Sequence, residues 1–148
     1  MSESRRAAEV GLHYLTTSAQ LRRTVDEHLA RGGVSLARTK ILQVLARRGP
    51  VKQAQLAMEL GLAARSITQA VEAMERDGLV RRTSDAEDRR AKVVTATEDG
   101  ARALAAGETA GNEILRRIFG RLGPDQLDTL DELLAVIDAT TTEARRVG

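Results

Sequence analysis

The amino-acid sequence predicts a mainly α-helical fold that carries a small β-hairpin wing. The 148-residue chain has one Phe, one Tyr and no Trp, so its core must be aliphatic, which suits packed helices better than a β-sandwich or barrel. Apolar residues recur at helical spacing along most of the chain. The exception is a pair of Val- and Thr-rich runs, residues 79–84 and 91–97, which a polar loop separates and which predict a hairpin.

Caps and breakers mark the first two predicted helices. One helix is expected over residues 4–30, where the apolar positions near helical spacing are Val10, Tyr14, Leu21, Val25 and Leu29. Ser35 is the expected N-cap of the next helix, and Gly49-Pro50 ends it.

The segment from residue 53 to residue 76 has the spacing of a helix-turn-helix. Helices are predicted over 53–60 and 64–76, with Gly61 where the turn needs a permissive backbone. Ala57 is small where the helices cross, and the expected apolar seam consists of Leu56, Leu60, Leu62 and Ile67. Two ordinary helices joined by a glycine turn are the alternative, but the hairpin that follows favours a winged helix-turn-helix over residues 35–97.

The two faces of the predicted 64–76 helix point to DNA. Its inner face is Ile67, Ala70, Val71 and Met74, whereas its opening turns carry Arg65, Ser66, Thr68 and Gln69. A helix fits the major groove of B-DNA, and the hairpin tip, with Arg89 and Arg90, could enter the minor groove beside it. A loop that is merely solvated is the alternative for the hairpin tip.

Charge is distributed unevenly along a nearly neutral chain. The net charge is only +2, yet six basic residues and four acids lie between Arg76 and Lys92. Cysteine is absent, which excludes disulfides, thiolate nucleophiles and thiol redox sensing. No apolar run is long enough to span a bilayer and the N-terminal residues do not resemble a signal peptide, so we expect a cytoplasmic protein with no membrane partner.

The C-terminal third predicts two more helices. Thr97 is the expected N-cap of a long helix toward Leu122, and Gly123-Pro124 starts a final one. Gly107 and Gly111 share a face of the first, where close helix packing and room for a ligand are competing explanations. The expected apolar stripes on these two helices and on the helix over 4–30 exceed what a small DNA-reading domain can cover, which predicts a two-fold dimer.

The order of elements and several local motifs resemble the MarR family of bacterial transcriptional regulators over nearly the whole chain. The most specific part is Asp85-Ala86-Glu87-Asp88-Arg89-Arg90, which is similar to the family's wing signature. The resemblance implies that 1–148 is a single MarR-like chain, with helical dimerisation regions at 4–31 and 98–146. It also implies a homodimeric repressor of a palindromic DNA operator that a small aromatic or anionic effector relieves.

Positions carried over from the family give the candidate site residues. The resemblance implies that Arg90 enters the minor groove and that Asp88 orients it. It implies further DNA contacts at Gln53, Arg65, Ser66, Thr68, Gln69, Arg89 and Lys92, of which Gln53, Arg89 and Lys92 could equally be surface residues. Three departures leave the operator sequence open: Ala63 replaces a frequent capping Ser or Thr, Gln69 a frequent basic residue and Ala96 a usual Leu.

Effector binding is implied near His13, Tyr14, Arg38 and Gly107, although a histidine on a long helix is more often a surface or interface residue. A constitutive DNA-binding or protein-interaction module without an effector is the alternative function. An enzyme is not expected, because the sequence has no nucleophile and base at suggestive spacing, no His-rich metal motif and no phosphate-binding glycine loop. We therefore expect no cofactor and no metal.

Overall fold

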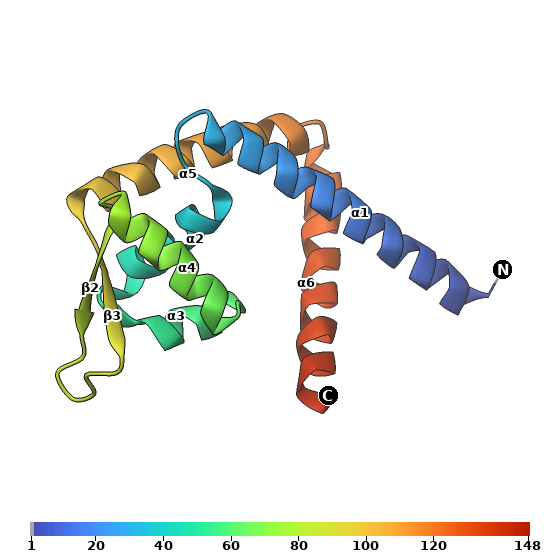
Figure 1. The fold of residues 1–148 in the computed structure, drawn as a ribbon. Coiled ribbons are helices and arrows are strands. Elements are labelled where there is room, and N and C mark those ends of the chain that lie inside the picture. The colour runs from blue at the N-terminus through green and yellow to red at the C-terminus, as the bar shows by residue number, and fades with distance from the viewer. Residues whose placement is uncertain (1) are drawn as a thin grey trace. The chain divides into compact units, whose positions relative to one another are not determined.

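The computed structural model describes residues 2–148, which form two compact units, the first ending at Asn112 and the second beginning at Glu113. The elements in chain order are α1 (Glu3–Ala30), α2 (Leu36–Arg48), β1 (Val51–Lys52), α3 (Gln53–Leu60), α4 (Ala64–Arg76), β2 (Val80–Ser84), β3 (Lys92–Ala96), α5 (Glu98–Phe119) and α6 (Pro124–Val147). The predicted fold class, mainly helical with a β-hairpin wing, is confirmed. In the first unit, α2, α3 and α4 gather beside the hairpin of β2 and β3 (Figure 1).

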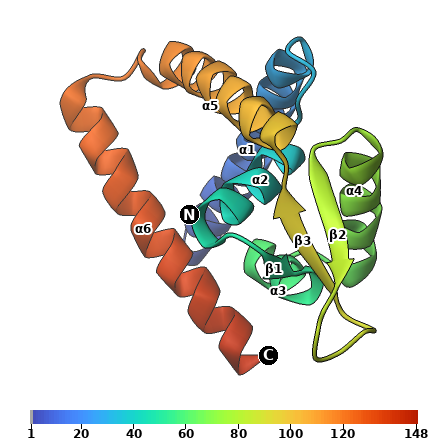
Figure 2. The same ribbon diagram turned by 90° about the vertical axis from the view of Figure 1, so that its left-hand side faces the viewer.

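The sheet has three strands rather than the two of the predicted hairpin. Its order is β1-β3-β2 and both pairings are antiparallel (Figure 2). The extra strand β1 has only two residues, Val51 and Lys52, which pair with Val94 and Val93. A two-residue strand shows no alternation of its own, because distant pairing alone creates it, so sequence periodicity could not reveal it.

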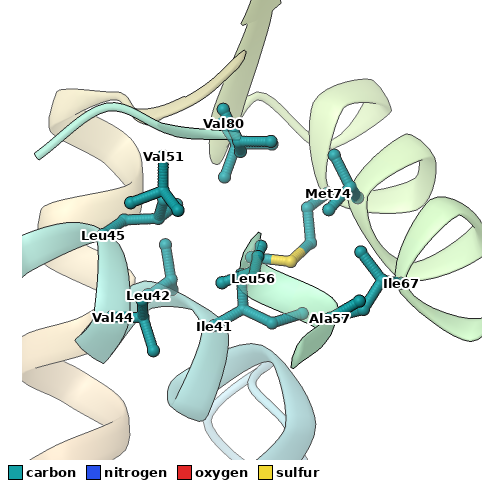
Figure 3. Packing of buried hydrophobic residues seen from close by; sticks show 12 residues of the cluster. Ile41, Leu42, Val44, Leu45, Val51, Leu56, Ala57, Ile67, Met74 and Val80 are labelled. Atoms are coloured by element: carbon teal, nitrogen blue, oxygen red, sulfur yellow. The ribbon is translucent and has the colours of Figure 1, made fainter. Parts of the chain in front are cut away.

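One aliphatic core holds the helix-turn-helix to the sheet. Side chains from α2, α3, α4 and the sheet converge on it, as Figure 3 shows for ten labelled residues. Ile67, Val71 and Met74 of α4 have no solvent exposure, and Leu56 and Ala57 meet them from α3. The predicted inner face of the 64–76 helix is therefore confirmed.

Gly61 makes the turn between α3 and α4 as predicted. Its backbone is left-handed, with φ 64° and ψ 31°. The next residue, Leu62, was expected in the apolar seam, and this expectation is wrong, since 44% of it is exposed. Its N–H donates to the Ala57 carbonyl at 3.0 Å to close the helix end, and this places Leu62 in the surface turn.

The predicted N-caps of α2 and α5 are present. The Ser35 hydroxyl accepts from the Arg38 N–H at 3.1 Å, and the Thr97 hydroxyl accepts from the Gly100 N–H at 3.1 Å. Thr97 also donates to the Gly78 carbonyl at 2.6 Å, so the start of α5 is held to the turn that follows α4. The Ser35 bond is thus local to α2, whereas Thr97 also bonds outside its own helix.

In the second unit, α6 begins with Pro124 at its first turn, as predicted. Its Leu130 and Leu134 are half-buried, whereas Leu127 and Ile137 of the same expected stripe are exposed. Among residues 2–148, no helix has the length and apolar character needed to cross a membrane.

Candidate nucleic-acid interface

The N-terminal half of α4 presents polar side chains to solvent. Arg65, Ser66 and Gln69 are exposed, while Ile67 points into the core between them. Ala63 occupies the N-cap position and makes no side-chain cap, as its identity predicts. The first backbone N–H groups of α4 therefore have no side-chain partner at the cap and can donate to an external acceptor.

Gln53 and Thr68 are both candidate DNA contacts, and their side chains form a hydrogen bond with each other. The Gln53 side-chain amide donates to the Thr68 hydroxyl at 2.8 Å, and that hydroxyl donates to the Ala64 carbonyl at 2.9 Å. Both side chains are half-buried. The pair therefore braces the first turn of α3 against the first turns of α4, and the hydroxyl proton of Thr68 is already used.

The tip of the hairpin is an ordered turn. The Asp85 N–H donates to the Ala91 carbonyl and the Ala91 N–H donates to the Asp88 carbonyl, both at 3.0 Å. The Asp88 carboxylate accepts from the Arg90 backbone N–H at 3.0 Å, so it holds the backbone of Arg90 and not, as expected, its guanidinium. This local bond satisfies a nearby N–H that the tight turn would otherwise leave open, and Arg89 and Arg90 remain exposed.

Some basic residues in and beside the hairpin form ion pairs and others do not. Arg82 pairs with Glu75, and Lys52 of β1 pairs with Asp85 at 3.5 Å. Within residues 2–148, Arg81, Arg89 and Arg90 are exposed and form no ion pair. The exposed arginines can therefore attract an anionic partner, whereas Arg82 serves the fold.

A pocket of about 220 Å³ lies between the start of α3 and the hairpin. Its polar lining brings together the predicted residues Gln53, Arg90 and Lys92, and Ala64 lines it from the first turn of α4. Lys52 also lines it and was missed by the sequence analysis, because the strand β1 that positions it was not predicted. The pocket therefore places the basic residues Arg90 and Lys92 beside the exposed end of α4.

The predicted effector residues lie on three helices, α1, α2 and α5. His13 and Tyr14 are exposed in the first half of α1. Arg38 lies on α2, where its guanidinium pairs with Asp77 at 2.8 Å. Gly107 packs against Thr39, since a Cβ there would lie 2.6 Å from the Thr39 Oγ1. Close helix packing is therefore the explanation for Gly107.

Comparison with known proteins agrees with this geometry. The MarR family model matches residues 34–92. YfiV, an uncharacterised HTH-type transcriptional regulator of Bacillus subtilis, is 26% identical over 113 residues, which cover 76% of this chain and 71% of that protein. The matched family consists of DNA-binding regulators and not of enzymes.

Two solved structures share the fold. AbsC, a MarR family transcriptional regulator from Streptomyces coelicolor, has a TM-score of 0.80 at 22% identity and covers 97% of each chain. A mutant MarR from E. coli complexed with operator DNA has a TM-score of 0.79 at 19% identity, covering 93% of this chain and 99% of that one. The family model thus matches the helix-turn-helix and most of the hairpin, and the two structures show that the chain shares the winged helix-turn-helix fold of MarR family transcriptional regulators.

Proposed function

We propose that this regulator is a homodimeric repressor that binds a palindromic operator, with α4 in the major groove and the hairpin tip in the minor groove. One observation carries the proposal: exposed Arg65, Ser66 and Gln69 on α4 belong to the same winged unit as the unpaired Arg89 and Arg90. Polar side chains on a helix can read base edges, and an arginine is attracted by the electronegative minor groove.

Of the remaining candidate residues, one is placed to contact DNA and the others hold DNA-contacting residues in position. Lys92 donates to Ser84 at 3.3 Å and is exposed, which suits a phosphate contact. Gln53 and Thr68 act through the bond between them, which orients the exposed end of α4. Asp88 acts through the backbone of Arg90. In this proposal these three residues support the DNA-contacting residues and do not read bases themselves.

Exposed apolar side chains support the homodimer. In the first unit, Val10, Leu12, Tyr14 and Leu15 of α1 are between 48% and 65% exposed. In the second unit, Leu133, Val136 and Ile137 of α6 are between 55% and 61% exposed. Large apolar residues that gather in this way mark surfaces for association, and a second copy of the chain would cover them.

The proposal is tested by selecting duplexes from a random-sequence DNA pool with the parent protein. We expect enrichment of an inverted repeat whose half-sites lie about 10 base pairs apart, because a two-fold dimer presents its two helices one turn apart. Arg90→Ala should weaken binding to the selected duplex about tenfold at any sequence, whereas Gln69→Ala should change the preferred base. No enrichment, or two variants that bind like the parent, would reject the proposal.

Relief by a small molecule is the remaining part of the proposed function. A thermal-shift screen with aromatic acids, followed by measurement of DNA release from the selected duplex, tests it directly. A compound that raises the melting temperature and releases DNA supports an effector-controlled repressor. No response at millimolar concentration favours the constitutive DNA-binding module instead.

A further inference from the structure

Arg82 occupies an unusual position for a charged residue. It lies on β2 opposite Val94 of β3, which is completely buried, and two residues after the buried Val80. Because side chains alternate along a strand, Arg82 shares the inner face with these two valines. Its side chain is only 21% exposed. A charge removed from water to this extent requires partners, or the fold loses much of its stability.

Glu75 on α4 supplies those partners. Its carboxylate accepts from the Arg82 backbone N–H at 3.0 Å and from the Arg82 Nη2 at 3.1 Å. Glu72, one turn earlier on α4, lies 3.8 Å from the Arg82 Nη1. The guanidinium and the backbone N–H of Arg82 hold the pKa of Glu75 below its ordinary value, so the pair is ionised at neutral pH.

The hairpin is attached to its neighbours on two sides. β1 pairs with Val94 and Val93, which lie opposite Arg82 and Thr83 of β2. Only the last strand pair, Ser84 and Lys92, and the loop extend beyond β1 as a two-stranded ribbon, which is weak when unsupported. On the β1 side, Lys52 pairs with Asp85 at 3.5 Å. On the α4 side, Arg82 forms ion pairs with Glu75 and Glu72. The Glu75 carboxylate accepts two hydrogen bonds from Arg82, one from its backbone and one from its side chain. Glu75 therefore holds both the backbone and the guanidinium of Arg82 on β2.

We propose that the Glu75–Arg82 pair sets the orientation of the wing relative to the recognition helix and so determines whether Arg90 reaches its groove. Arg82 and Glu75 are positioning residues and do not contact DNA. The tip lies beyond Arg82 by two further residues of β2, roughly 7 Å, and by the loop, so a small rotation at Arg82 displaces Arg90 much more. This inference rests on the proposed function, because it requires the wing to contact DNA.

A double-mutant cycle tests the inference. Binding of the parent, Glu75→Gln, Arg90→Ala and the double variant to the duplex selected with the parent is measured by fluorescence anisotropy. We expect Glu75→Gln to weaken binding several-fold and Arg90→Ala to weaken it about tenfold in the parent. In the Glu75→Gln background, Arg90→Ala should weaken binding less than about threefold, because a misplaced wing has already lost that contact.

The control is Glu108→Gln on α5, which removes the same charge from an exposed residue. In that background Arg90→Ala should keep its tenfold effect. Circular dichroism confirms that each variant is folded, and Arg82→Lys, which keeps the charge but loses the paired hydrogen bonds, replaces Glu75→Gln if the latter does not fold. An equal effect of Arg90→Ala in both backgrounds would overturn the inference alone. No effect of Arg90→Ala in the parent would instead overturn the proposed wing contact, and the inference with it.

Discussion

At the scale of single residues, Gly107 is required by packing. A Cβ at this position would lie 2.6 Å from the Thr39 Oγ1, and Thr39 is buried and held by its bond to the Ser35 carbonyl at 2.8 Å. Ala improves helix propensity by about 1 kcal/mol over Gly, but overpacking at a buried contact costs about 1 to 3 kcal/mol. Gly107→Ala should therefore lower the free energy of unfolding in urea by about 1 kcal/mol.

Gly111 provides the matched control, one turn later on the same helix. Nothing lies within 4 Å of a Cβ built there. Gly111→Ala should therefore raise the free energy of unfolding by up to about 1 kcal/mol. If both substitutions had the same sign, the Thr39 contact would not be what distinguishes the two glycines.

Glu75 should make stability depend on acid pH. Its pKa is lowered from 4.5 by Arg82, so ionised Glu75 stabilises the fold above its unfolded-state pKa, and this contribution is lost as the pH falls through the lower folded-state pKa. The difference in unfolding free energy between the parent and Glu75→Gln should therefore be largest near neutral pH and shrink below 4.5. Urea unfolding over a pH series measures it, and a constant difference would contradict the ionic role.

At the scale of elements, Asp88 could stabilise the turn at the hairpin tip either by its charge or by its hydrogen bond to the backbone. Its carboxylate accepts from the Arg90 N–H at 3.0 Å, and an Asn side chain can accept the same bond. Asp88→Asn should therefore bind the selected duplex within about twofold of the parent, whereas Asp88→Ala should bind several-fold more weakly. Anisotropy titrations distinguish the two. A similar loss in both variants would show that the carboxylate charge orients the guanidinium.

Local signals explain which elements the sequence could predict. Ser35, Gly61, Thr97 and Pro124 mark helix ends through caps, a left-handed turn and a fixed φ, and each acts within a few residues of itself. The strand β1 could not be predicted, because it exists only through pairing with β3, about 40 residues later.

In the candidate site too, features that depend on local sequence could be predicted, and features that depend on distant contacts could not. The exposure of Arg65, Ser66 and Gln69 follows from helical periodicity, which the sequence displays. Arg82, in contrast, is one of the six basic residues between Arg76 and Lys92, and only its ion pair with Glu75 shows that its charge is used within the fold. Arg38, expected near an effector, is likewise paired with Asp77. Side-chain partners on different elements depend on tertiary geometry that a sequence pattern does not contain.

At the scale of the whole molecule, association through α6 should control DNA binding. Leu133, Val136 and Ile137 share one face of this helix, because they are spaced by three and four residues, and each is more than half exposed. A buried carboxylate in such an interface has no partner and is costly. Ile137→Glu should therefore raise the dimer dissociation constant at least tenfold by sedimentation equilibrium.

The neighbouring Asp138→Asn is the control, since Asp138 is an exposed polar residue on the same helix. It should leave the dimer unchanged, and circular dichroism should show equal helix content in both variants. If the two-fold arrangement delivers both recognition helices to one operator, Ile137→Glu should also reduce affinity for the inverted repeat toward that for a single half-site, because the two binding events are no longer linked. A parent that sediments as a monomer, or an Ile137→Glu variant that remains dimeric, would show that this face of α6 does not join two copies.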